Sequence, residues 1–245
     1  MKRRGGARSG TTAIRGQTDD APLHTPLLEV CASSYTSALN AQAGGADRIE
    51  FCTELSVGGL TPSHDEILAV KQALDIPVFV LIRPRVGNFL YSAQELEQMK
   101  ADILFCKKAG CEGVVFGVLD HAGRPDLTAM KALIKAAQGM QLTFHRAFDA
   151  IQAPEKTMQA LADLGFHRIL TSGPGPRAVD HIDTLRDWVS AGEGSISIMP
   201  GGSIRPDNIK ALLQTGAREF HSSCIPPGEA ETAAEMVTEL KALLL

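Results

Sequence analysis

The pattern Glu-X-Cys occurs twice near the start of the chain, each time at the end of a short apolar run. The first copy holds Glu29 and Cys31, and the second holds Glu50 and Cys52. Because side chains alternate between the two faces of a strand, each glutamate shares a face with the cysteine that follows it. Two neighbouring parallel strands would place the two thiols about 5 Å apart. Cu(I) is soft and prefers thiolate ligands, so Cys31 and Cys52 form a candidate copper site.

Other interpretations of this cysteine pair stay open. Free cysteine is among the most buried residue types and often only packs, and a redox or catalytic thiol is a further alternative. Cys106 and Cys111 fall at a predicted helix end, where we interpret them as packing or surface residues. Cys224 follows the last predicted strand and is a candidate third ligand.

The composition narrows the class of protein. The chain has 245 residues, 44% of them hydrophobic, and a net charge of −4, which suits one globular domain and predicts no nucleic-acid partner. Five cysteines are too few and too scattered for a secreted disulfide scaffold, so we expect a cytoplasmic protein. No apolar run approaches the roughly 18 residues that a membrane span needs, so we expect no membrane partner. Residues 1–25 are basic and poor in apolar residues, which predicts a flexible tail before a domain over 26–245.

From Pro26 onward a short apolar strand and a longer amphipathic segment alternate, which predicts a single (β/α)8 TIM-type barrel. An open doubly wound sheet is the alternative, but eight units of even length favour closure. Prolines at the starts of the predicted helices and glycines at their ends support the assignment. The predicted strands are 27–31, 48–52, 78–83, 113–119, 141–147, 168–172, 195–201 and 218–222. The predicted helices are 34–43, 62–74, 93–109, 126–138, 154–164, 178–191, 206–214 and 230–244.

Polar residues gather where these strands end, the end at which barrels of this type carry their chemistry. Glu29, Glu50, Arg83 and His145 would suit acid–base catalysis on a small anionic metabolite, with Arg83 holding an anion or neutralising one of the glutamates. A salt-bridge network that fills the barrel is the structural alternative for the carboxylates. Asp149 either orients His145 or Arg146 or caps the following turn, and we favour the cap.

The last two strands carry residues typical of a phosphate site. Gly201, Gly202 and Ser222 lie where barrels commonly seat a phosphate on backbone amides, after the seventh and eighth strands. We therefore treat these three as candidate binding residues for a phosphorylated metabolite.

A series of phrases in this order is similar to the CutC family of copper homeostasis proteins. They are GGADRIEFC (44–52), GGLTPS (58–63), IRPR (82–85), FLYS (89–92), TFHRAFD (143–149), RILTSG (168–173), MPGGSI (199–204) and EFHSS (219–223). The resemblance implies a TIM-type barrel, a cytoplasmic location, a role in copper tolerance or trafficking, and Cu(I) bound by Cys31 and Cys52. The chain departs from the family pattern at Val86-Gly87-Asn88, where a carboxylate is lost, and in a short loop after Ser223.

These observations together predict a copper homeostasis protein that binds Cu(I) through Cys31 and Cys52. The alternative is a barrel enzyme that acts on a small anionic or phosphorylated metabolite. We expect a homo-oligomer, joined through its outer helices.

Overall fold

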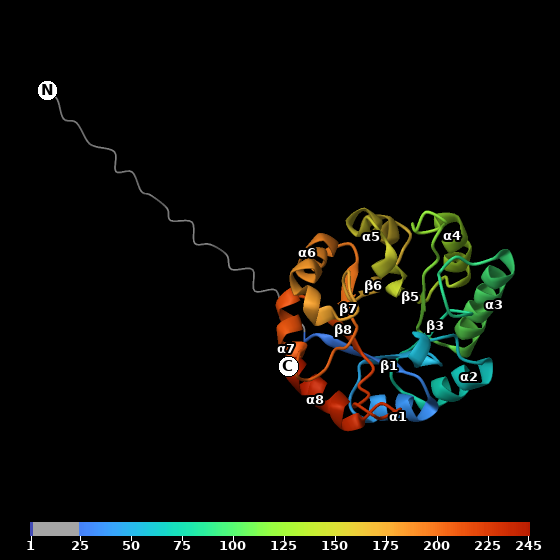
Figure 1. The fold of residues 1–245 in the computed structure, drawn as a ribbon, viewed down its shortest axis with the longest axis horizontal. Coiled ribbons are helices and arrows are strands. Elements are labelled where there is room, and N and C mark those ends of the chain that lie inside the picture. The colour runs from blue at the N-terminus through green and yellow to red at the C-terminus, as the bar shows by residue number, and fades with distance from the viewer. Residues whose placement is uncertain (2–24) are drawn as a thin grey trace.

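Eight short parallel strands form one sheet that curls into a barrel (Figure 1). The structure is a computed structural model, and it describes Met1 and residues 25–245. The strands are β1 (Leu27–Ala32), β2 (Arg48–Phe51), β3 (Val78–Leu81), β4 (Gly113–Phe116), β5 (Gln141–Phe144), β6 (Arg168–Thr171), β7 (Ser197–Pro200) and β8 (Glu219–Ser222). Hydrogen-bonded neighbours follow the order β7-β6-β5-β4-β3-β2-β1-β8. A parallel bridge between Gly201 and His221 joins the two remaining edges. The predicted (β/α)8 barrel is therefore confirmed.

Helices surround the strands on the outside of the barrel (Figure 1). They are α1 (Tyr35–Ala43), α2 (His64–Ala73), α3 (Ala93–Ala109), α4 (Leu127–Ala136), α5 (Pro154–Asp163), α6 (Ile182–Gly192), α7 (Ile209–Leu212) and α8 (Ala234–Leu244). Their starts follow local capping chemistry: Ser63 and Ser92 each form a capping box with a glutamate three residues on, and Pro154 occupies the first position of α5. The predicted tail, residues 1–25, lies almost wholly outside the described residues.

Some predicted boundaries were wrong because local turns compete with the regular elements. The helix predicted over 206–214 shrinks to the short α7, since Asn208 accepts a hydrogen bond from the Arg205 amide (2.9 Å) and holds residues 206–208 in a turn. The strand predicted over 141–147 ends at Phe144, because His145 begins a 3₁₀ turn over Arg146–Ala150. The last helix begins at Ala234 rather than at residue 230.

The alternation of side chains along the strands divides the buried residues into two groups. Residues such as Val30, Ile49 and Val80 point outward and pack against the helices in one large apolar core. A much smaller apolar cluster lies inside the barrel, where Cys31, Cys52, Phe79, Leu81 and Val115 contact one another. Much of the rest of the interior is polar, including the buried Glu29, Arg48 and Arg168, which is unusual because barrel interiors are mostly filled by Val, Ile and Leu.

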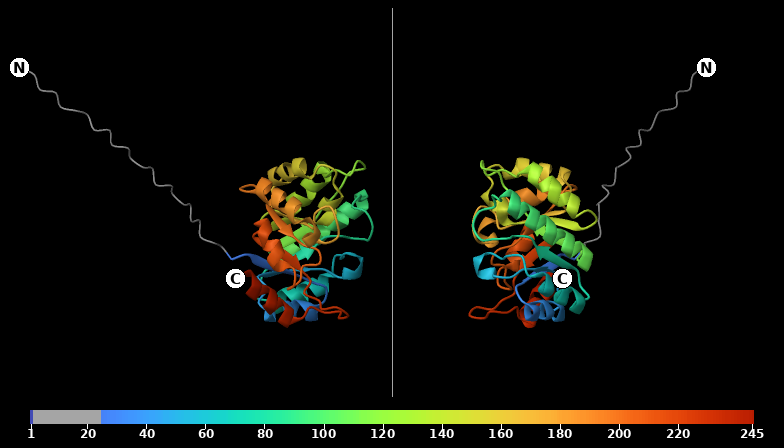
Figure 2. Two further views of the ribbon diagram at one scale, coloured as in Figure 1. Left: turned by 60° about the vertical axis from the view of Figure 1, so that its left-hand side comes forward. Right: turned by 90° about the vertical axis from the view of Figure 1, so that its right-hand side faces the viewer.

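The loops that follow the strands project from one end of the barrel. Figure 2 shows this in side view for the connections after β2, β3 and β8, which extend beyond the strands on the same side. The carboxyl end of every strand points toward that side, so the polar residues at the strand ends meet there. Within the described part of the chain, no helix combines the length and the apolar character that crossing a membrane requires.

Candidate functional site

The thiols of Cys31 and Cys52 lie next to each other inside the barrel. Their Sγ atoms are 3.7 Å apart, and both side chains are buried. The strand register explains the contact: Cys31 pairs with Glu50 across β1 and β2, and Cys52 follows two residues later on the same face. The thiol–thiol contact and burial raise the pKa of Cys31 well above its usual range. Cys31 borders the cavity at the carboxyl end of the barrel, and Cys52 lies behind it.

Glu29 lies deeper in the barrel and is fully buried. One of its carboxylate oxygens accepts a hydrogen bond from Arg48 Nε (2.5 Å), and the other lies 2.7 Å from Nδ1 of His221. Burial acts to raise the pKa of Glu29, but Arg48 and His221 outweigh it and hold that pKa far below its usual range. Glu29 is therefore an ionised carboxylate, paired as the structural alternative predicted.

A second ion-pair layer continues from Glu29 through the barrel interior. Arg48 and Arg168 both bind the carboxylate of Glu219, and their guanidinium groups lie 5.1 and 5.0 Å from the ring centroid of Phe79. Two cations thus share one aromatic ring and two carboxylates, of which Glu29 is fully buried and Glu219 is 12% exposed. This network fixes the strands from which the two cysteines and His221 project.

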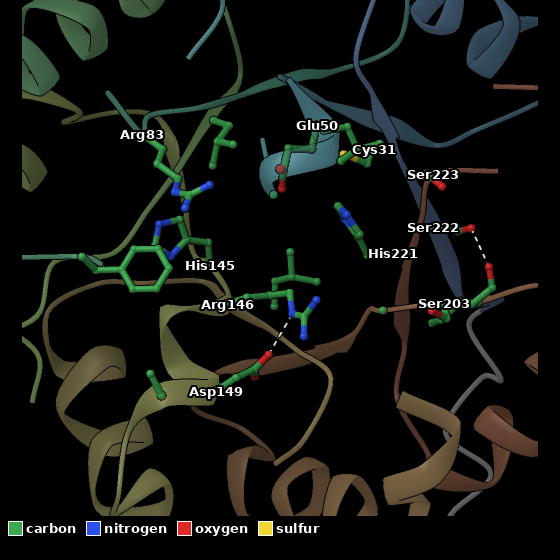
Figure 3. Close-up of a pocket in the computed structure, with 18 of the residues that line it drawn as sticks. Cys31, Glu50, Arg83, His145, Arg146, Asp149, Ser203, His221, Ser222 and Ser223 are labelled. Carbon is green, nitrogen blue, oxygen red and sulfur yellow. Dashed lines mark hydrogen bonds and ion pairs between the residues drawn. The ribbon is translucent and has the colours of Figure 1, made fainter. Parts of the chain in front are cut away.

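Glu50 has a different environment from Glu29. Burial raises its pKa to about 8, helped by the nearby charge of Glu29 and opposed by His221. Its Oε2 is buried and has no hydrogen-bond partner among the described residues. One ligand atom from each of Cys31, Glu50 and His221 lies within 4.8 Å of the others, so these three could share a metal ion (Figure 3). Burial lowers the pKa of His221, but Glu29 and Glu50 outweigh it and raise that pKa above its usual value.

A cavity of about 670 Å³ opens at the carboxyl end of the barrel, and the labelled side chains of Figure 3 face it. Arg83 and His145 lie on one side of it. Arg83 donates to the carbonyl oxygens of Val57, Gly59 and Gly87, at 2.9, 2.8 and 3.2 Å. The prediction that Arg83 neutralises Glu29 or Glu50 was wrong, because this guanidinium group is anchored to backbone carbonyls of the loops after β2 and β3.

His145 caps the 3₁₀ turn that follows β5. Its Nδ1 accepts a hydrogen bond from the Ala147 amide (3.2 Å), and its ring contacts Phe89 with centroids 4.8 Å apart. Burial and the charge of Arg83 lower the pKa of His145 to about 3, so the imidazole is neutral at physiological pH. Its Nε2 is buried and has no hydrogen-bond partner in the described part of the chain.

Asp149 orients Arg146 rather than capping a turn. Its carboxylate binds Arg146 Nε (2.8 Å) and accepts a hydrogen bond from the Thr171 hydroxyl (2.5 Å). The preferred prediction of a cap was therefore wrong. The physical reason is that β6 brings Thr171 beside Asp149, which ties the turn after β5 to the end of the neighbouring strand.

The candidate phosphate residues have distinct positions. Gly202 and Ser222 border the cavity. Gly201 packs against Leu170, and a Cβ atom added at Gly201 would come within 2.5 Å of Leu170 Cδ1. Gly201 is thus required by the close approach of side chains from neighbouring strands. The Ser222 hydroxyl donates to the Ile204 carbonyl (2.8 Å) and accepts from the Cys224 amide (3.1 Å), so it is already engaged within the protein.

Cys224 does not join the thiol pair. It packs in the outer apolar core together with Cys106 and Cys111, and all five cysteines are free. His221 was not among the ligands predicted from the sequence. Its position within EFHSS on the last predicted strand could have placed it beside the first strand, because closure of a barrel makes the first and last strands neighbours.

The fold and this site define a (β/α)8 barrel protein with buried thiols and polar groups at the carboxyl end of its strands. The model of the CutC family matches residues 26–226, and the chain belongs to this family. A family protein CutC of Xanthomonas axonopodis pv. citri is 48% identical over 197 residues, which cover 80% of this chain and 82% of the relative. The Homo sapiens relative, named copper homeostasis protein cutC homolog, is 46% identical over 198 residues, covering 80% of this chain and 72% of the relative. The solved structure of CutC from Streptococcus agalactiae superimposes with a TM-score of 0.77 at 34% identity, over 81% of this chain and 98% of that one. The predicted family is confirmed.

Proposed function

We propose that this protein acts in copper homeostasis by binding one Cu(I) ion between Cys31 and Cys52. The observation that carries the proposal is the 3.7 Å separation of the two Sγ atoms inside the barrel. Two metal–thiolate bonds of about 2.3 Å that meet at a tetrahedral angle put their sulfurs about 3.8 Å apart, so a metal ion fits without movement of the strands. The human relative's name as a copper homeostasis protein supports the same role.

His221 is the third ligand in this proposal, because one of its ring nitrogens lies within 4.8 Å of the Cys31 thiol. Its Nδ1 is held 2.7 Å from Glu29, which leaves Nε2 as the ring nitrogen free to face a metal ion. A carboxylate that orients a ligating histidine in this way is a common arrangement in metal sites. Glu50 completes the group, but Cu(I) prefers sulfur and imidazole to a carboxylate, so we place Glu50 beside the metal rather than on it.

The burial of the thiols sets the conditions for loading. The raised pKa of Cys31 keeps its proton on at neutral pH, so Cu(I) must displace thiol protons when it binds. Cys31 borders the cavity and is the thiol that incoming copper meets first, whereas Cys52 is enclosed behind it. Copper then moves from the mouth of the barrel to a site shielded from water and oxidants, as a carrier or buffer requires.

The test is an anaerobic titration of Cu(I) against a competing chelator, bicinchoninic acid. We expect one equivalent to bind, and the Cys31→Ser, Cys52→Ser double variant to lose it while its circular dichroism spectrum stays unchanged. The Cys106→Ser, Cys111→Ser double variant is the matched control, since it removes two other buried thiols and should bind copper as the unmodified protein does. Removal of the imidazole by His221→Phe should weaken binding about tenfold or more. Copper binding that survives the loss of Cys31 and Cys52 would refute the proposal.

Two further expectations accompany this function. We expect a cytoplasmic location, because five scattered cysteines are too few for a secreted disulfide scaffold, and localisation of a tagged chain would test it. The homo-oligomer expected from the sequence stays a prediction, which sedimentation equilibrium of the full chain would decide.

A further inference from the structure

Four buried side-chain atoms lack a hydrogen-bond partner among the described residues, and three of them belong to residues around the cavity. The four are Glu50 Oε2, Arg83 Nε, Tyr91 OH and His145 Nε2, and Tyr91 alone is not part of the cavity wall. Buried polar groups are nearly always hydrogen-bonded, so such a concentration of exceptions at one place indicates a missing partner. The copper site does not supply it, because it uses neither Arg83 nor His145.

Arg83 presents a fixed pair of donors. Its Nη1 donates to two carbonyl oxygens and its Nη2 to one, which leaves the Nε–H and one Nη2 hydrogen without a partner among the described residues, with the Tyr91 hydroxyl close to the guanidinium group. Nε and Nη2 share one edge of the guanidinium plane, the edge that binds carboxylates and phosphates through two parallel hydrogen bonds. The side chain is 7% exposed, and its anchoring to loop carbonyls orients this edge in advance.

His145 adds a third donor. Because Nδ1 accepts the Ala147 amide hydrogen, the proton of the neutral ring resides on Nε2, which is the atom without a partner. His145 is 5% exposed, and its ring cannot shift easily because it is closely packed. The ring contacts Phe89 on one side, and a Cβ atom added at Gly117 would come within 2.8 Å of it. Arg83 and His145 both contact the Phe89 ring, so their donors lie on the same side of the cavity, as Figure 3 shows.

The charges around the cavity favour an anion. Arg146 is neutralised by Asp149, but neither Arg83 nor Arg205 forms an ion pair with any carboxylate of the described residues. A cavity of about 670 Å³ is much larger than a bare inorganic anion, and Leu81, Phe89, Leu170 and Ile204 supply apolar walls. The occupant must therefore combine acceptor oxygens with an organic body.

We propose that this cavity binds a small organic oxyanion, a carboxylate or a phosphate monoester, whose acid group is held by Arg83 and His145. The body of the ligand lies over the apolar walls toward β6, β7 and β8. This function goes beyond copper binding and depends on other residues. The two sites are neighbours, because Cys31 and Glu50 border the same cavity.

The test is titration calorimetry of the copper-free full chain at constant ionic strength. The probes are two carboxylates, benzoate and malonate, two phosphate esters, phenyl phosphate and glycerol 3-phosphate, and the neutral compounds benzamide and glycerol. We expect at least one oxyanion to bind with a definite stoichiometry and the neutral analogues not to bind. The carboxylate and phosphate pairs then show which acid group the site prefers.

Two variants assign the binding to the proposed donors. Arg83→Lys keeps the charge but removes the two-donor edge, and His145→Asn keeps an acceptor for the Ala147 amide but removes the Nε2 donor. Each should raise the dissociation constant of the bound probe about tenfold or more. Arg124→Lys, on an exposed arginine paired with Asp120, is the matched control and should leave it unchanged.

Two further measurements keep the outcomes distinct. The Cys31→Ser, Cys52→Ser variant should bind the oxyanion normally, so that failure of the copper site and failure of this proposal are separate results. In the unmodified protein, the imidazole ¹H–¹⁵N signal of His145 Nε2 should shift when the probe is added, which requires no variant to fold. Absence of binding by all four oxyanions, or binding that neither variant weakens, would overturn the proposal.

Discussion

Replacing Glu29 by glutamine should cost this barrel a large part of its stability. The carboxylate is fully buried and joins Arg48, at 2.5 Å from Nε, to His221, at 2.7 Å from Nδ1. In Glu29→Gln, two buried guanidinium groups, those of Arg48 and Arg168, would share the single carboxylate of Glu219. Removing one partner of a buried pair costs about 3–5 kcal/mol, because an uncompensated charge stays behind. We expect a loss of this size in the free energy of unfolding.

The assay is equilibrium unfolding in urea of four proteins: the unmodified chain, Glu29→Gln, Arg48→Met and the double variant. If the two groups stabilise each other, the double variant should be more stable than the sum of the single losses predicts, by about 1–3 kcal/mol. Glu97→Gln is the matched control, since this carboxylate is 74% exposed and lies 3.2 Å from Lys100. Its loss should stay below about 0.5 kcal/mol. A loss under about 1 kcal/mol for Glu29→Gln, or strict additivity with Arg48→Met, would refute the reasoning.

Three further predictions concern separate features. The folded protein holds the pKa of His145 at about 3, below the ordinary 6.5, so protons bind the unfolded chain more readily and acid destabilises the fold. Between pH 6 and 4, the free energy of unfolding of His145→Asn should therefore rise relative to that of the unmodified protein by up to roughly 1.4 kcal/mol per pH unit. Equal dependence of the two unfolding free energies on pH would contradict this. Gly59→Ala should destabilise the barrel by about 1–3 kcal/mol in thermal unfolding, because Gly59 has φ +83° and a Cβ atom would come within 2.7 Å of Leu81; an unchanged melting temperature would show that the loop relaxes. Ser63→Ala should cost about 1 kcal/mol in urea unfolding by breaking the capping box with Glu66, and Ser63→Asp should retain most of that stability.

The contact between the two thiols was predictable because it depends on few assumptions. The repeated Glu-X-Cys phrase places both cysteines at the ends of consecutive strands, and consecutive strands of a barrel are neighbours. The 3.7 Å separation of the Sγ atoms follows from that adjacency and from the alternation of side chains. The family resemblance led to the same two residues.

The partners of the buried charges were not predictable in this way. Arg83 was expected to neutralise Glu29 or Glu50, but the register places Arg48 opposite Glu29, and barrel closure places His221 on its other side. Arg83 is instead used by carbonyl oxygens of the loops after β2 and β3. Irregular loops leave carbonyls without regular partners, and no sequence pattern states which cation will satisfy them.

The sequence by itself determined the order of strands and helices, the end of the barrel at which polar groups gather, and the adjacency of Cys31 and Cys52. These depend on local periodicity, caps and chain connectivity, which act over a few residues or between consecutive units. Only the tertiary structure decided that His221 adjoins Glu29 and Cys31, and that Arg83 and His145, each with a buried nitrogen that has no hydrogen-bond partner among the described residues, border one cavity. Those relations arise from the stagger and closure of the barrel, which bring together residues such as Glu29 and His221, 192 positions apart in the chain.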